Sequence, residues 1–175
     1  MRTALVAGVL SLIAAVGAAA EDDGCRRFAW SVDRELVLFG DGLMADVESE
    51  GALPKDGVFA LRLRPVERVI YAAAPARSRD GGFGGIVTLE WIAAGRYQIT
   101  LSGDAWIDAV QNGRRLPMIA TTRRGDCPAV RQSVQVEVES QPLTLQFGGA
   151  AVERLDVSVL RVREGAGRRL SAPAR

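Results

Sequence analysis

Apolar and polar residues alternate with a period of two along most of the chain from residue 58 onward. Side chains two positions apart lie on the same face of a β-strand, so each such run predicts a strand with one face toward a core. The runs cover residues 58–64, 66–71, 87–91, 97–102, 105–111, 114–120, 134–139, 143–147 and 155–162. The second run is either a strand of its own or a bulged continuation of the first across Pro65. About eight short strands separated by turn signals predict an all-β fold, an antiparallel β-sandwich with jelly-roll-like connections.

Turn residues between the strands set the expected register. Asn112 and Gly113 form the dipeptide that best accepts a type I′ hairpin turn, so residues 114–120 are expected to pair back on residues 105–111. In the preceding strands, Trp91 and Tyr97 occupy positions on the apolar face that alternate with polar residues, so both are expected to lie in the core. The Gly-rich residues 80–85 are expected to end a long loop that enters a strand, with Phe83 anchoring the loop against the core.

Residues 30–39 show a different pattern, with apolar side chains at helical spacing. Val32, Leu36 and Phe39 would share one face of a helix that Ser31 caps and Gly40 ends. We therefore predict one short N-terminal helix, and the wholly apolar residues 36–39 leave a buried strand as the alternative. Residues 41–57 keep no period and are expected to be a connection.

The first twenty residues have the order of a secretory signal peptide, with Arg2, an apolar segment over residues 4–16, and small residues up to Ala20. Cleavage is expected after Ala20, which makes the protein periplasmic or secreted, without membrane insertion. An uncleaved N-terminal anchor is the alternative. Residues 21–163 then form a single domain, long enough to bury a sizeable core. Residues 164–175, rich in Gly, Ala, Pro and Arg, are expected to be a disordered tail.

The chain has two cysteines, Cys25 and Cys127, and in an exported protein two cysteines are most simply one disulfide. A reactive thiol pair or a metal site is the alternative, although the sequence has no C-x-x-C motif. The 22 basic and 21 acidic residues give a net charge of +1, and loss of Arg2 with the leader makes the mature chain formally neutral. Arginine pairs occur without aromatic residues between them, so we expect solvated loop charge and no nucleic-acid partner.

Histidine is absent from the sequence. Its absence removes the usual general base of neutral pH, the histidine-dependent nucleophile arrangements and the common zinc and iron sites, so we expect no metal and no cofactor. Asp104 and Asp108 leave a carboxylate-dependent hydrolase as an alternative function. On one strand these two residues would lie about 13 Å apart, beyond the spacing of a glycosidase pair. Asp108 is instead expected to hydrogen-bond across a turn or to pair with an arginine such as Arg131.

Trp106 shares its strand phase with Asp108 rather than with Ile107 and Ala109. The amphipathic ring of Trp106 is therefore a candidate for surface recognition, and packing beneath a loop is the alternative. Trp106, Asp108 and Arg131 are the candidate binding residues.

Two stretches of the sequence resemble a family of small secreted proteobacterial proteins of uncharacterised function: FGGIVTLEWIAAGRYQITLSGDAWIDAVQNGRRL at residues 83–116 and CPAVRQSVQVEVESQPLTLQFGGA at residues 127–150. Cys25, Phe28 and Trp30 add to the likeness, and Gln132 stands where members tend to have a lysine. Some members are labelled homogentisate 1,2-dioxygenase, but the iron site of such an enzyme requires histidine ligands, which this chain lacks. The resemblance implies an exported, compact domain and supplies no catalytic residue.

The function favoured by the sequence is that of an exported, non-enzymatic binding or accessory module of the bacterial envelope, with an unknown envelope ligand or protein as its partner. One alternative is the hydrolase that would use Asp104 and Asp108. A structural subunit of a larger periplasmic complex is the other, and a large exposed apolar patch would be its signature.

Overall fold

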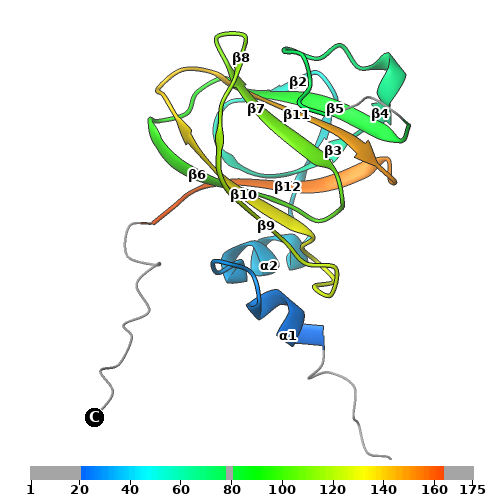
Figure 1. Ribbon diagram of the computed structural model, residues 1–175, viewed down its shortest axis with the longest axis vertical. Helices are drawn as coiled ribbons and strands as arrows, with labels where there is room; N and C mark the ends of the chain where they lie inside the picture. Colours follow the sequence, from blue (N-terminus) through cyan, green and yellow to red (C-terminus); the bar gives the residue numbers. More distant parts are fainter. Residues whose placement is uncertain (1–20, 78–80, 164–175) are drawn as a thin grey trace, which may run out of the picture.

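Two β-sheets pack face to face in the computed structural model, which describes residues 21–77 and 81–163 (Figure 1). The expected signal peptide at residues 1–20 and the expected tail at residues 164–175 lie outside the described residues. The helical elements are α1 (Glu21–Arg26), α2 (Asp33–Gly40) and a 3-10 helix at Val66–Arg68. The strands are β1 (Ala45–Glu48), β2 (Gly51–Leu53), β3 (Gly57–Arg62), β4 (Arg64–Pro65), β5 (Phe83–Leu89), β6 (Gly95–Leu101), β7 (Trp106–Gln111), β8 (Arg114–Arg115), β9 (Met118–Arg123), β10 (Gln132–Val138), β11 (Leu143–Ala150) and β12 (Arg154–Arg161).

The first sheet has the strand order β1-β3-β12-β6-β10-β9, and the second has the order β2-β5-β11-β7-β8, with β4 paired to β5. Four antiparallel pairs are nested inside one another along the chain: β3 with β12, β5 with β11, β6 with β10, and β7 with β8. The first half of the eight-strand chain thus pairs with the second half in reverse order, as in a long hairpin. Successive pairs of this hairpin alternate between the two sheets, which is the jelly-roll arrangement. The expected all-β sandwich is therefore confirmed.

The hairpin between β7 and β8 lies at the middle of the nested pairs. Asn112 has a φ of 50° and Gly113 a φ of 70°, which are the two left-handed residues that a type I′ turn requires. Val110 pairs with Arg115 and Gln111 with Arg114 across the turn. The turn expected from the Asn-Gly dipeptide is thus present.

Within the described residues, β1, β2, β4 and β9 are added to the eight nested strands. Two of them, β1 and β2, pair parallel to β3 and β5, so both sheets are mixed rather than purely antiparallel. These strands fall in residues 41–57, which we expected to be a connection. Each is only three or four residues long, so no run of period two exists there to signal it.

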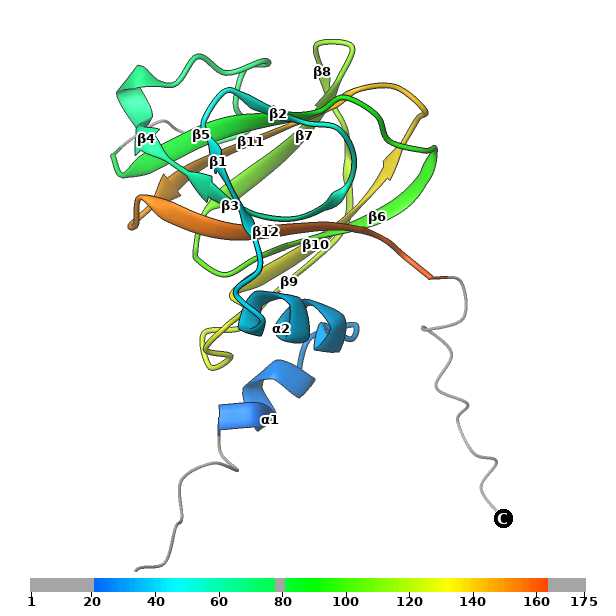
Figure 2. The same ribbon diagram turned by 180° about the vertical axis from the view of Figure 1, so that it is seen from behind.

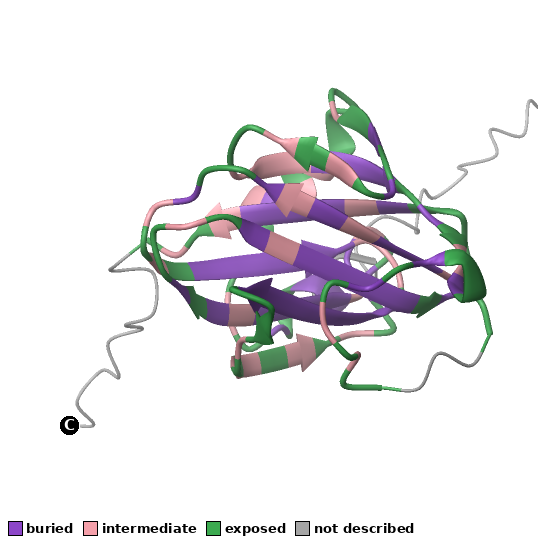
Figure 3. Cartoon of the chain, turned by 90° about the horizontal axis from the view of Figure 1, so that it is seen from above, coloured by how far each residue is buried: buried purple, intermediate pink, exposed green. Residues whose placement is uncertain are grey.

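The core lies between the sheets, and Figure 3 shows buried residues concentrated along the central strands. Tyr97 is buried as expected, at 2% exposed. Trp91 is 61% exposed, so its assignment to the core was wrong. The strand β5 ends at Leu89, and beyond it the chain turns so that Ile92, at 1% exposed, enters the core in place of Trp91.

Two expected strands differ from the structure. Residues 66–71 form a 3-10 helix followed by an extended segment, and the buried Val66, Val69 and Tyr71 pack outside the second sheet. Of residues 114–120, only β8 pairs with β7, and after Pro117 the chain crosses to the first sheet as β9. Proline is confined to strand ends and edges, which explains why the strand stops there.

The N-terminal helices lie outside the first sheet, next to β9 and β10 (Figures 1 and 2). The helix expected at residues 30–39 is present as α2. Its N-cap is Val32 and not the expected Ser31, although the Ser31 Oγ accepts a hydrogen bond from the Asp33 N–H at 3.2 Å. Cys25 and Cys127 form a disulfide that fastens this segment to the loop before β10. Phe28, Val32 and Val130 complete a small apolar cluster around it. Across the described part of the chain, every helix is too short and too polar to cross a bilayer.

Candidate functional site

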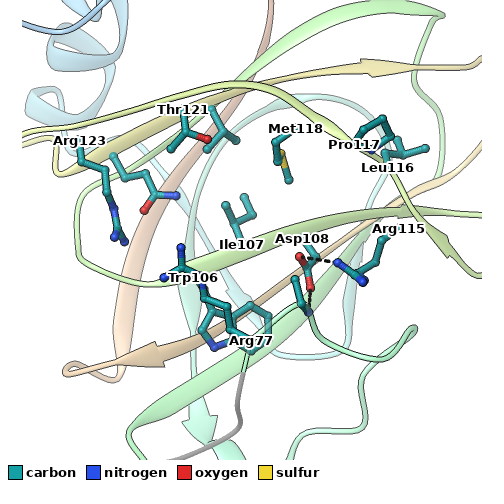
Figure 4. A pocket seen from close by; sticks show the side chains of 13 residues that line it. Arg77, Trp106, Ile107, Asp108, Arg115, Leu116, Pro117, Met118, Thr121 and Arg123 are labelled. Atoms are coloured by element: carbon teal, nitrogen blue, oxygen red, sulfur yellow. Dashed lines mark hydrogen bonds and ion pairs between the residues drawn. The ribbon is translucent and has the colours of Figure 1, made fainter.

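A cavity of about 280 Å³ opens where β7 and β8 of the second sheet face β9 and β10 of the first (Figure 4). Arg123 and Arg115 lie at opposite ends of it, with Ile107 and Met118 between them. The segment after Tyr71 contributes the third arginine of the lining, Arg77. The cavity is therefore built from three parts of the chain that are distant in sequence.

The cavity exists because β8 leaves β7 after two residue pairs. Along residues 106–108, β7 has β11 on one side and no β8 residue on the other. A β-bulge in the pairing of β9 with β10 then leaves Ile119 without a partner, and a bulge switches the face that the following side chains occupy. Met118 consequently faces the core, whereas Ile119 is 46% exposed.

Trp106 packs beneath the loop that precedes β5 and is only 9% exposed. Its ring centroid lies 5.2 Å from that of Tyr71, in a tilted arrangement. Gly148 permits this packing, because a Cβ at that position would clash with the indole ring. The structure thus shows the packed arrangement, one of the two interpretations that the sequence left open.

Asp108 ties the segment at residues 73–76 to the second sheet. Its Oδ2 accepts hydrogen bonds from the Ala76 N–H at 3.0 Å and from the Gln146 Nε2 at 3.2 Å. The Gln146 amide also exchanges two hydrogen bonds with the backbone of Ala73, at 3.1 and 3.2 Å. Asp108 therefore holds the loop over Trp106, a positioning role.

The arginine beside Asp108 is Arg115, with an N···O distance of 4.0 Å, and not Arg131. Arg131 lies in the connection between β9 and β10, where its Nη1 donates to the Gly125 carbonyl. An arginine beside Asp108 was expected and is present. The example named, Arg131, was wrong, because the separation of two residues along the chain does not reveal which strand ends meet. Of the three candidate binding residues, the structure brings Trp106 and Asp108 to the cavity and leaves Arg131 outside it.

Gln132 is a cavity residue that the sequence analysis missed. It is 4% exposed, and its Oε1 has no hydrogen-bond partner. The Trp106 Nε1 is also buried without a partner, and the remaining buried unpaired side-chain atom in the described part of the chain is the Ser158 Oγ, which does not line the cavity. A signal was present in the sequence, since Gln132 shares the inward phase of Val134 and Val136.

Positive charge predominates around the cavity. The Nη2 of Arg123 donates to the Ala105 carbonyl at 3.3 Å, and Arg77 makes no ion pair within residues 21–77 and 81–163. Asp108 is the one acidic residue among the lining residues, against three arginines. The cavity therefore suits an anion better than a cation.

Asp104, the other carboxylate considered for catalysis, lies exposed just before β7 and does not line the cavity. Within residues 21–77 and 81–163, no three Asp, Glu, Cys or His side chains come together as metal ligands. The arrangement at the cavity can supply hydrogen bonds, positive charge and apolar contact.

A second cavity of about 330 Å³ lies beside α2, but several of its polar side chains are already paired. The Trp30 Nε1 donates to the Ser133 Oγ at 2.9 Å, and the Gln98 Nε2 donates to the Ser31 carbonyl at 3.3 Å. Glu35 is buried and pairs with Arg34 at 3.2 Å. The first cavity is the stronger candidate because two of its lining residues, Trp106 and Gln132, have buried polar atoms without a hydrogen-bond partner.

We find no match to this chain among protein-family models, curated proteins or solved structures.

Proposed function

We propose that the protein is an exported, non-enzymatic binding module of the bacterial envelope, and that its ligand occupies the cavity between β7, β8, β9 and β10. One observation carries the proposal. Two of the three buried, unpaired polar side-chain atoms in the described part of the chain belong to residues that line this cavity. Leaving such a group unpaired costs about 1 to 3 kcal/mol, and a ligand that pairs with the Gln132 amide would remove that cost.

The setting of the cavity supports a binding role. The disulfide between Cys25 and Cys127 suits an oxidising compartment, and the order of residues 1–20 is that of an export signal. Asp108 already accepts two hydrogen bonds that hold the loop in place, so it serves the shape of the site rather than a proton transfer.

The proposal is tested by filling the cavity. The purified mature protein is screened against glycans, peptidoglycan fragments and envelope extracts, and each hit is titrated again with Met118→Trp and Ile119→Trp. Met118 lines the cavity, whereas its neighbour Ile119 is exposed on the same strand. We expect Met118→Trp to abolish binding and Ile119→Trp to leave it unchanged. Equal binding by the two variants, or no hit with the wild-type protein, would overturn the proposal.

A further inference from the structure

We infer that the ligand of this cavity is a small hydroxylated organic anion, a sugar acid or sugar phosphate, whose charged group lies at the end of the cavity formed by Arg77 and Arg123. The inference rests on the proposed function and names the chemical class that the site would accept.

The charge of the ligand follows from the arginines. Among the residues that the structure describes, Arg115 is the one of the three with a carboxylate beside it, that of Asp108 at 4.0 Å. Arg123 makes one hydrogen bond to a backbone carbonyl, and Arg77 makes none within the described residues. A guanidinium group presents several N–H donors in a planar fork that fits the oxygens of a carboxylate or a phosphate. An oxyanion would therefore pair with donors that the protein leaves free.

The hydroxyl group follows from Gln132. Gln132 lies opposite Arg123 in the register of β10 and β9, so its amide lies beside the same end of the cavity. The unpaired Oε1 requires a donor, which a carboxylate or phosphate does not supply at neutral pH but a neighbouring hydroxyl does. A molecule that carries both an oxyanion and hydroxyl groups meets all of these requirements.

The organic body follows from the remaining walls. Ile107, Leu116, Met118 and Val134 give the cavity an apolar side, and the C–H face of a sugar ring can pack against such a surface. A volume of about 280 Å³ lies near the lower end of the range for small-molecule sites. The space suits a single sugar ring rather than a bare inorganic ion or a long chain.

The class is tested with four probes that share one ring and differ in charge: glucuronic acid, glucose 6-phosphate, glucose and glucosamine. Each is titrated into the mature protein at neutral pH and low salt, and binding is followed by changes in the amide NMR spectrum. We expect at least one of the two anions to bind at least tenfold more tightly than glucose, and glucosamine to bind no better than glucose. Raising the salt concentration should weaken the binding of an anion, because exposed charges are screened.

Three variants locate the contact. Arg77→Gln removes a charge without breaking a hydrogen bond or ion pair within the described residues, and Gln132→Met removes the unpaired amide. Arg96→Gln is the matched control, because Arg96 lies on β6 and pairs with Glu137 at 3.5 Å, away from the cavity. Each cavity variant should lower the affinity for the anion about tenfold, because Arg77→Gln removes a hydrogen bond to the charged group and Gln132→Met removes one to a hydroxyl. Arg96→Gln should lower it less than twofold.

The outcomes separate this inference from the proposed function. If glucose binds as tightly as both anions and Met118→Trp abolishes that binding, the cavity is a binding site and the anionic class is wrong. If an anion binds but Met118→Trp or the cavity variants leave its affinity unchanged, the anion binds elsewhere and the inference fails. If none of the four probes binds, the class is wrong, and the wider ligand screen then decides the proposed function.

Discussion

At the scale of single residues, Gln132 and Gln146 are two buried glutamines in opposite hydrogen-bonding states. Gln146 is fully buried and makes hydrogen bonds to Ala73 and Asp108. Gln132 is 4% exposed and has an unpaired Oε1. A satisfied buried amide stabilises the fold, whereas an unsatisfied one opposes it.

Replacing each glutamine by methionine, which has a similar length and no amide, should therefore have different effects. Gln132→Met is expected to leave the free energy of unfolding unchanged or to raise it by about 1 kcal/mol, because an unpaired group is removed. Gln146→Met should lower it by about 1 to 3 kcal/mol, because the Ala73 backbone and Asp108 lose their partner. Urea unfolding of the ligand-free variants measures both changes. Equal losses in the two variants would mean that the Gln132 amide is paired in solution.

Tyr97 gives a prediction for the dependence of stability on pH. Burial of its hydroxyl raises the pKa of Tyr97 above its ordinary value, and the negative charge of Asp56 raises it further. Above about pH 10 the unfolded chain ionises this tyrosine while the folded protein keeps it protonated. Its contribution is therefore complete below that pH and is lost as the pH rises through the folded pKa.

The comparison of wild type with Tyr97→Phe isolates this effect. The free energy of unfolding, measured by urea titration from about pH 8 to about pH 11, should fall more steeply with pH in the wild type than in Tyr97→Phe. Parallel profiles would contradict the raised pKa of Tyr97.

At the scale of elements, the alternation of residues predicted β6, β7, β10, β11 and β12 because each of them has an inward apolar face that packs in the core. The same rule failed at Trp91. The strand ends where the chain leaves the sheet, and the alternation of apolar and polar residues does not show that point. The rule also failed beyond Arg115, although Pro117 stood inside the expected strand and signalled its end.

The hairpin between β7 and β8 offers a matched pair of glycine substitutions. Both Gly113 and Gly57 have open space where a Cβ would be added, but only Gly113 has a positive φ, of 70°. Gly113→Ala should lower the free energy of unfolding by about 1 kcal/mol, because a side chain makes that conformation unfavourable. Gly57→Ala should leave it unchanged or raise it by about 0.5 kcal/mol, because alanine reduces the freedom of the unfolded chain.

Chemical denaturation of both variants measures these changes. A loss in Gly57→Ala as large as that in Gly113→Ala would show that the effect does not arise from the turn conformation.

At the scale of the whole molecule, the nested pairing joins strands that are far apart in sequence, such as β3 and β12. This architecture was predictable because the Asn-Gly turn and the alternation of apolar and polar residues can both be read from short stretches of sequence. The cavity was not predictable in the same way, because it forms where the crossover after Pro117 meets the loop held by Asp108. Arg115 and Arg123 belong to arginine pairs that were expected to be solvated loop charge, and only the fold brings them to one cavity with Arg77.

The disulfide acts on the molecule as a whole, since it joins residues 102 positions apart. A crosslink over a loop of this length restricts the unfolded chain and contributes roughly 4 to 5 kcal/mol. The double variant Cys25→Ser with Cys127→Ser should lose about that much free energy of unfolding.

The control for this prediction is reduction by dithiothreitol. Treatment should lower the stability of the wild type to that of the double variant and should leave the double variant unchanged. Equal stability of the oxidised wild type and the double variant would show that the crosslink does not restrict the unfolded chain.

The same bond has a consequence for the protein in the presence of proteases. Cys25 and Cys127 enclose every strand from β1 to β9. A single break in the backbone anywhere between them leaves one covalently connected molecule, and the nested strands hold the two pieces in the same two sheets. A nicked chain would therefore keep its mass on a non-reducing gel and separate into two fragments only after reduction.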